Sequence, residues 1–316
     1  MQSSTTLSAE LIVDAKPLTS CDYHRVVLPF SVLKKVKPKV PVLVFNRLYS
    51  GGYAELCRMK KNGARVIVDI DDSPFLDSSH YLFEHYKRDQ TSTRIVNELA
   101  LADVITVTNS RLADVVRGVL PKASIEVVPN ALPFDKGQFI KNRLFDDPQR
   151  VVYAAGPSHY LDSKILPLGF GQDYAFAGDM PHPQWQKMRE HHPHASFRLA
   201  RPVQAYMGLY EGHKIAVAPL KRSDFNACKS NLKMLEAGAR GLAFVASPVH
   251  PYTDSIDIPH VVYADTKTDW GDAFRKLFVD RSYREDMAAS LAQHVRENYQ
   301  LERSNKIRRQ IIESFR

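Results

Sequence analysis

The segment 226-NACKSNLKMLEAGARG-241 places two lysines beside residues that favour the start of a helix. Ser230 and Asn231 are types that often occupy the N-cap position, and apolar residues then recur at helical spacing. The first N–H groups of a helix have no partner within it, so they attract anions. Lys229 and Lys233 would strengthen that attraction. The pattern therefore predicts an anion site at the start of a short helix that opens near Ser230.

Glu236 lies on the same side of this helix as the two lysines, at three- and four-residue spacing. Cations and N–H donors suit a diphosphate, and a carboxylate one turn further along can accept hydrogen bonds from ribose hydroxyls. Gly238 and Gly241 allow close packing and a helix stop. A solvated charged face with a Lys233–Glu236 ion pair is the alternative interpretation.

A second candidate turn follows the apolar run 151-VVYAAG-156. Gly156 allows a ligand to approach the backbone closely, and small residues after a strand often form a phosphate-binding turn. Ser158 and His159 come next and could contact the same ligand. The alternative is an ordinary turn with a surface or structurally bonded histidine.

In the first half of the chain, 68-VDIDDSPF-75 brings Asp69, Asp71 and Asp72 to the end of a predicted strand. Carboxylates there could bind a hard cation or abstract a proton. A helix cap at Asp72, with Asp69 bonded to neighbouring backbone, is the alternative. The motif has low specificity for a metal, so we expect contact with an acceptor substrate and no metal site.

The segment 20-SCDYHRVVLP-29 carries Asp22, His24 and Arg25. We expect it to be a loop between the first strand and a helix, on the edge of the sheet that binds ligands. Catalytic and acceptor-binding roles are therefore expected for Asp22, His24, Asp71 and Asp72.

Short β-branched runs separated by helical patterns must position these residues. In the first half the predicted strands are 10–15, 41–46, 65–70, 103–108 and 125–130. In the second half they are 151–156, 173–178, 195–200, 214–220, 242–247 and 260–265, and two helices are predicted from about 271 to 314. This alternation is typical of a parallel sheet covered on both faces, with ligands at the carboxyl ends of its strands.

The polar stretch 131–150, with Pro133, Gly137 and Pro148, suits an interdomain linker. The prediction is an α/β protein of two doubly wound domains that face a central cleft. We expect an N-terminal domain over 1–135, a linker over 136–150 and a C-terminal domain over 151–316, whose final helix packs back on the first domain.

A chain of 316 residues with 44% hydrophobic content can bury a large core. It has no apolar run long enough to span a membrane and no secretory signal pattern, so a cytoplasmic protein is expected. The three cysteines lack metal-ligand spacing. No G-x-G-x-x-G follows a predicted strand, which argues against an NAD-dependent oxidoreductase.

The formal net charge of +8 is compatible with an anionic partner such as nucleic acid, or with a merely solvated surface. Basic residues that could grip phosphates occur in the first half of the chain; they are Lys34, Lys35, Lys37, Lys39, Arg47 and Arg58.

The chain resembles GT-B glycosyltransferases of the family-4 type that use nucleotide sugars, in a short phage or bacterial form. The resemblance lies in four segments that follow the family's order; they are 102-ADVITVTNSRLADVV-116, 126-EVVPNALPFD-135, 152-VYAAGPSHYLD-162 and 226-NACKSNLKMLEAGARGLAFVASP-248. It implies transfer of a sugar from a nucleotide diphosphate to a hydroxyl acceptor, with retention and without a metal. The resemblance implies that Glu236 contacts the ribose and that the turn before it contacts the diphosphate.

One position departs from the family pattern. Typical members carry two glutamates eight positions apart, and Cys228 stands where the first would be. A non-catalytic module that binds nucleotide sugars is therefore the competing hypothesis. UDP is the default donor nucleotide, with its base read near Arg201 and Pro202. The acceptor is expected to be a carbohydrate or lipid-linked glycan, or a hydroxylated base in DNA, and no stable membrane insertion is expected.

Overall fold

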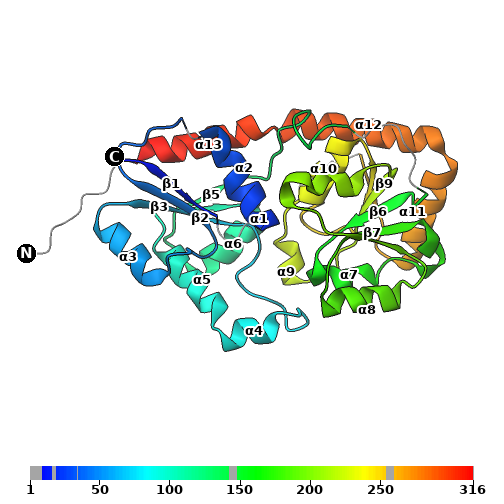
Figure 1. Cartoon of the computed structure of the whole chain (residues 1–316), viewed down its shortest axis with the longest axis horizontal. Helices are drawn as coiled ribbons and strands as arrows, with labels where there is room; N and C mark the ends of the chain where they lie inside the picture. The colour runs from blue at the N-terminus through cyan, green and yellow to red at the C-terminus, as the bar shows by residue number, and fades with distance from the viewer. Residues whose placement is uncertain (1–8, 16–18, 34, 142–147, 254–259, 316) are drawn as a thin grey trace, which may run out of the picture. The chain divides into compact units, whose positions relative to one another are not determined.

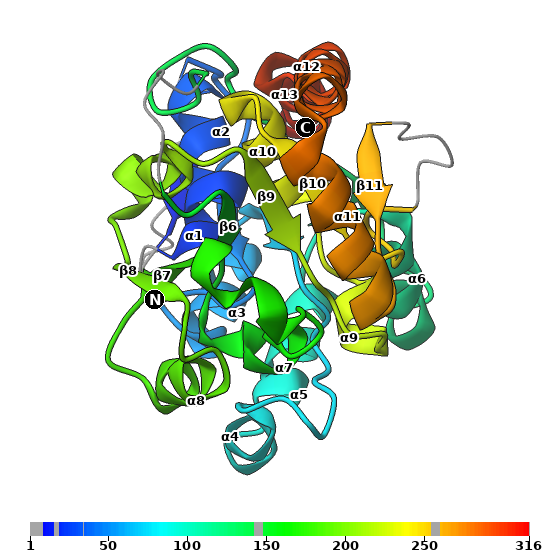
Figure 2. The same cartoon turned by 90° about the vertical axis from the view of Figure 1, so that its right-hand side faces the viewer.

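A computed structural model describes residues 9–15, 19–33, 35–141, 148–253 and 260–315 (Figures 1 and 2). The chain divides into two compact units. The first unit contains Met1–Ala131, Cys228–Ser230 and Leu301–Arg316, and the second contains Leu132–Ala227 and Asn231–Gln300. Part of the predicted linker, 142–147, lies outside the described residues.

The first unit is built on a parallel sheet in the sequential order β1-β2-β3-β4-β5. Its strands are β1 (Leu11–Asp14), β2 (Val42–Asn46), β3 (Arg65–Ile70), β4 (Val104–Val107) and β5 (Ile125–Val127). Its helical segments are α1 (Ser20–Asp22), η1 (Tyr23–Val27), α2 (Leu28–Leu33), α3 (Tyr53–Lys61), α4 (Phe83–Arg88), α5 (Thr91–Ala100), α6 (Ser110–Val119) and α13 (Leu301–Ser314).

Helices cover both faces of this sheet because successive strand side chains point to opposite sides. Val42 and Val44 of β2 pack in one buried cluster with residues of α2 and α13. Leu43 and Phe45 pack in another, with residues of α3, α5 and α6. Figure 1 shows the same two groups of helices on opposite sides of the sheet.

The second unit is a six-stranded parallel sheet in the order β11-β10-β9-β6-β7-β8. Its strands are β6 (Val151–Ala154), β7 (Tyr174–Asp179), β8 (Ser196–Leu199), β9 (Ile215–Ala218), β10 (Ala243–Ala246) and β11 (Val261–Tyr263). Its helical segments are η2 (Pro157–His159), α7 (Tyr160–Ser163), η3 (Leu168–Asp173), α8 (Pro183–His191), η4 (Val203–Tyr210), α9 (Asp224–Ala227), α10 (Leu232–Arg240), α11 (Lys267–Val279) and α12 (Arg281–Asn298).

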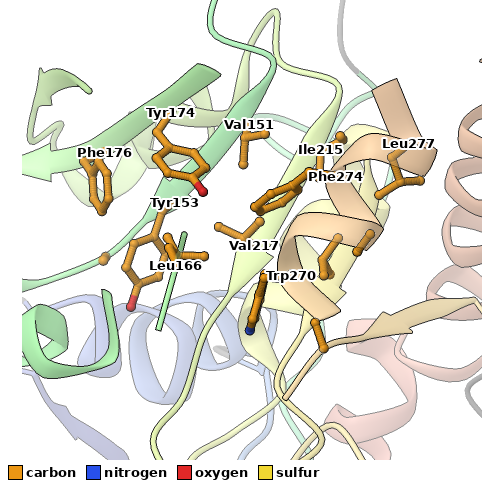
Figure 3. Close-up of a cluster of buried hydrophobic side chains, with 14 of the residues drawn as sticks. Val151, Tyr153, Leu166, Tyr174, Phe176, Ile215, Val217, Trp270, Phe274 and Leu277 are labelled. Atoms are coloured by element: carbon orange, nitrogen blue, oxygen red, sulfur yellow. The ribbon is translucent and has the colours of Figure 1, made fainter. Parts of the chain in front are cut away.

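One face of the second sheet packs against α8 and α11. Trp270 and Phe274 of α11 point toward Ile215 and Val217 of β9 (Figure 3), and all four side chains are buried. On α10, Gly238 allows close packing against α12, because a β-carbon there would lie 2.5 Å from Val295 Cγ2. Such helix layers on a parallel sheet confirm the predicted α/β class.

Each predicted strand overlaps an observed one, but the prediction for the end of the chain was wrong. Three helices, α11, α12 and α13, occupy the region where two were expected. Asp280 ends α11 and its side chain caps α12 by accepting a hydrogen bond from Tyr283 N. Gln300 then forms an isolated bridge with Leu132 before α13 begins. An Asp N-cap inside a helical pattern therefore marks a break here.

Candidate active site

The second sheet has the strand order of the dinucleotide-binding fold. Numbered from β6, the order is 3-2-1-4-5-6, so the chain reverses direction across the sheet between β6 and β9. In such sheets the crevice outside the carboxyl ends of the two central strands binds ligands. The turn after β6 and the loop after β9 lie at that position.

The turn after β6 brings Gly156 and His159 to this switch point. Gly156 has extended backbone angles, and a β-carbon added to it would meet no atom within 4 Å. No neighbouring group among the described residues requires a glycine at position 156. A ligand that lies against the backbone there would require one. Ser158 is half-buried on η2 beside it.

His159 is buried, and its Nδ1 lies 2.8 Å from Asp162 Oδ2. The other carboxylate oxygen, Oδ1, accepts hydrogen bonds from Lys221 N at 2.9 Å and from Asn226 Nδ2 at 3.0 Å. Because Lys221 follows β9, one carboxylate joins the turn after β6 to the loop after β9. When Asp162 is ionised, His159 carries its proton on Nδ1, so the ring orientation and tautomer are fixed.

The N-terminus of α10 also lies at the carboxyl ends of the strands, because α10 follows β9 and precedes β10. Asn231 is the N-cap residue, one position from the predicted start, although its side chain makes no capping hydrogen bond. Gly241 adopts a left-handed conformation (φ 70°) at the C-cap, which confirms the predicted stop. Lys233 lies half-buried in the first turn.

Glu236 is buried on α10 and accepts a 2.6 Å hydrogen bond from the hydroxyl of Tyr210. Burial raises the pKa of Glu236 to about 7, although the attraction of Lys233 and the Tyr210 hydrogen bond oppose the rise. Arg201 is exposed and packs over Gly208 of η4, the same segment that carries Tyr210. The structure thus connects Arg201 and Glu236 through η4, a relationship with no signal in the sequence.

In the first unit, Asp71 and Asp72 follow β3 and share a cation. Arg47 Nη2 lies 3.0 Å from Asp71 Oδ1 and 3.7 Å from Asp72 Oδ2. Burial opposes ionisation of Asp71, but the charge of Arg47, a hydrogen bond from Cys21 and the charge of Arg25 together lower the pKa of that carboxyl. Arg47 has a positive φ of 65°, a conformation that is uncommon for a residue with a side chain. No helix begins at Asp72, so the capping alternative was wrong.

Asp69 is separate from this pair and belongs to the core. Its two oxygens accept 2.8 Å hydrogen bonds from Nε and Nη2 of Arg25. Thr106 Oγ1 donates a third, at 2.5 Å. Asn46 Nδ2 also donates to Asp69 Oδ1, at 3.2 Å. The side chains of Arg25, Thr106 and Asn46 therefore satisfy Asp69, whereas the alternative interpretation expected neighbouring backbone to do so. All three partners come from distant parts of the chain.

The expectation that residues 20–29 form a loop was wrong. They lie in a continuous helical stretch, α1, η1 and α2, which begins after the capping residue Thr19. Asp22 closes the reciprocal capping box with Thr19, and this bonding explains its buried position. His24 is buried in the π-helical turn, and burial lowers its pKa to about 4. Its imidazole is therefore neutral at pH 7.

Residues 228–230 belong to the first unit, although the sequence pattern had joined them to the helix that follows. Asn109 Nδ2 donates to the carbonyls of Cys228 and Lys229, at 3.2 and 3.0 Å. Lys229 Nζ lies 3.6 Å from Asp72 Oδ1. The Cys228 side chain packs in the apolar cluster beside α6, where a carboxylate would bury a charge. Ser230 follows, half-buried.

Asp162 and Tyr210 were not among the predicted site residues. Asp162 follows His159 at a spacing of three, which is a recognisable pairing on a helical turn. Tyr210 has no such local signal. Within the described ranges, no group of three or more His, Cys, Asp or Glu side chains is arranged to hold a metal ion.

The strand order of the second sheet is that of a Rossmann fold, and the turns described above lie at its switch point. The whole chain has the GT-B fold, built from two Rossmann-like α/β domains, as comparison with solved structures shows. Sucrose-phosphate synthase from Thermosynechococcus elongatus matches with a TM-score of 0.66 and 15% identity, over 95% of this chain and 81% of that one.

Other similar structures have the same architecture. S. aureus TarM, solved with UDP, has a TM-score of 0.62 and 13% identity, over 90% of this chain and 58% of TarM. Anabaena HepE, also solved with UDP, has a TM-score of 0.57 and 10% identity, over 91% of this chain and 82% of HepE. No family model and no curated protein sequence matches the chain.

Proposed function

We propose that the protein is a glycosyltransferase that transfers a sugar from a UDP-sugar to a hydroxyl acceptor. The observation that carries the proposal is the His159–Asp162 bridge at the switch point of the second sheet, on the edge where α10 begins. The similarity to structures solved with UDP supports uridine as the default base. Gly156, Ser158 and Lys233 would contact the diphosphate, and Glu236 the ribose.

The reaction breaks the bond between the anomeric carbon and the diphosphate oxygen and forms a bond to the acceptor oxygen. Negative charge grows on the departing diphosphate, so Lys229, Lys233 and the N–H groups at the start of α10 would stabilise it. We propose that no metal is needed, because these groups supply the positive charge. The acceptor hydroxyl would hydrogen-bond to Asp71.

Retention at the anomeric carbon is the favoured stereochemistry. An inverting reaction needs a general base with a pKa near the working pH. Arg47 lowers the pKa of Asp71, which makes this carboxylate a weak base. The departing diphosphate would instead accept the proton from the attacking hydroxyl on the same face of the sugar. Analysis of the anomeric configuration of the product by NMR tests this proposal.

Calorimetric titration of the full chain with UDP, with and without EDTA, tests the donor. We expect saturable binding that EDTA does not change, and weaker binding of ADP and GDP. The absence of binding to every nucleotide would overturn the proposal. Lys187→Gln, an exposed change on α8, is a matched control for Lys233→Gln.

A second candidate, a binding module without turnover, is favoured by Cys228, which lies in an apolar cluster where the resemblance expects a carboxylate. Slow release of sugar from a UDP-sugar by purified protein distinguishes the two. The transferase proposal expects release in the wild type and its loss in Lys233→Ala with the fold intact. No release from any donor, together with normal UDP binding, would favour the module.

The acceptor is proposed to be a glycan, with a hydroxylated DNA base as the alternative. Lys35, Lys37 and Lys39 are exposed, as the DNA alternative requires, while Lys34 lies outside the described residues. Arg47 and Arg58 form ion pairs with neighbouring carboxylates. The DNA alternative predicts duplex binding that falls steeply with salt and weakens in a triple lysine-to-glutamine variant at 35, 37 and 39. If that variant binds duplex DNA as well as the wild type does, the result would support a glycan acceptor.

A further inference from the structure

A cationic cavity of about 980 Å³ lies in the second unit. It is at the amino ends of the strands, whereas the donor turns are at their carboxyl ends. His213 and Lys214 directly precede β9, and Gly241 and Leu242 directly precede β10, so their backbone marks the amino ends of these strands. The donor turns follow the carboxyl ends. The cavity is therefore a different place from the site proposed for UDP.

Positive charge dominates the lining of this cavity. Six basic side chains line it, against the two carboxylates of Asp135 and Glu285; the six are Lys141, Lys214, Arg240, Arg281, Arg284 and Arg296. Asp135 pairs with Arg296 at 2.7 Å and Glu285 with Arg281 at 2.7 Å. These two pairs leave the cavity with a clear excess of positive charge.

Arg240 is the buried member of the set. It is the last residue of α10 and is 6% exposed. Its Nε is buried and has no hydrogen-bond partner among the described residues. Burial and the nearby Arg201 lower the pKa of Arg240, although Glu211 attracts it. A buried guanidinium N–H without a hydrogen bond is costly. Arg240 also lines the cavity, so its guanidinium group is placed to contact an anion bound there.

The negative end of the α10 dipole would weaken anion binding if its last carbonyls were bare. Arg296 reduces this effect, because its Nη1 donates to the carbonyl of Gly238 at 3.1 Å and its Nη2 lies 3.4 Å from that of Ala239. Lys141 lies over Gly241, where a β-carbon would sit 3.1 Å from Lys141 Cε. The carbonyl end of α10 is thus covered by cations.

From this arrangement we propose that the cavity binds a small metabolite that carries two or more phosphate groups. Several cations at different points of the wall suit several anionic groups held at once, and guanidinium forks match phosphate oxygens in two-point contacts. The volume suits a compact molecule, since ligand pockets of roughly 300 to 1,000 Å³ are usual for such ligands. A nucleic acid would instead require an extended basic surface.

Titration of the full chain with inositol hexakisphosphate and with tripolyphosphate, at about 0.15 M salt, tests the proposal. We expect saturable binding of at least one probe. Arg240→Gln and, separately, Lys214→Gln should each weaken it about tenfold or more, because each removes a charge-assisted hydrogen bond. Lys187→Gln, which lies outside the cavity, should bind as the wild type does.

Thermal unfolding followed by circular dichroism identifies any variant that fails to fold, and Lys214→Gln serves if Arg240→Gln does not fold. Three results would overturn the proposal. They are no saturable binding of either probe up to about 1 mM, wild-type affinity in both cavity variants, or a short duplex DNA that displaces the probe and depends on the same residues. A failure to bind UDP would count against the proposed function alone.

Discussion

The hydroxyl of Tyr210 donates a 2.6 Å hydrogen bond to Oε2 of Glu236, and both side chains are buried. The carboxyl is thus held on α10 in surroundings that disfavour its charge, and burial raises its pKa to about 7. A group with such a pKa changes its protonation state near neutral pH, so stability and donor binding should both respond to pH there.

Stability should fall as pH rises through 7. The folded state binds the Glu236 proton more tightly than the unfolded chain, whose carboxyl has a pKa of 4.5. This contribution is complete below pH 4.5 and is lost as pH rises through 7, and its size is about 3 kcal/mol. Urea unfolding of wild type and Glu236→Gln at pH 5 and pH 8 measures it. An equal pH dependence in both proteins would contradict the assignment.

Affinity for a UDP-sugar should rise about tenfold from pH 6 to pH 8 if the ionised Glu236 accepts the ribose hydroxyls. A UDP-sugar is the right probe, because its diphosphate does not titrate in this range while the terminal phosphate of UDP does. Glu236→Gln should bind weakly at both pH values with no slope. A slope that persists in the variant would assign the effect to another group.

Asp162→Asn should lower the rate of donor hydrolysis about tenfold or more, because an amide cannot hold His159 in one tautomer as a carboxylate does. The asparagine can still accept from Lys221 N through its carbonyl oxygen, so folding should be retained. His159→Ala should have at least as large an effect, and His194→Ala, on an exposed histidine, should have none. Steady-state kinetics of the three variants measure this. Full activity in His159→Ala would exclude the histidine from the site.

Arg25 and Arg308 are both buried in the first unit, yet their replacement should change stability by very different amounts. Arg25→Met leaves the Asp69 carboxylate without its bidentate partner and should cost about 3 to 5 kcal/mol of the free energy of unfolding. Burial and the nearby Arg25 lower the pKa of Arg308 to about 9. Arg308→Met removes a second buried cation and should change stability by less than about 1 kcal/mol. Denaturant titrations compare the two, and equal losses would show that Arg308 shares the pairing.

The positions of the strands were determined by the sequence itself. The run 65-RVIVDI-70 is β3 to the residue, because β-branched side chains disfavour other backbone conformations locally. The end of α10 at Gly241 is local in the same way, since only glycine adopts a left-handed C-cap without strain. These features depend on neighbours within a few residues, so a pattern in the chain is enough to predict them.

Only the tertiary structure decided which chemical groups meet. Arg25 pairs with Asp69 across 44 residues, and Asn109 holds the carbonyl of Cys228 across 119. The order of the second sheet brings the loops after β6 and β9 together, which makes Asp162 a bridge between them. Side-chain partners depend on strand order and burial, which long-range packing fixes and local periodicity does not encode.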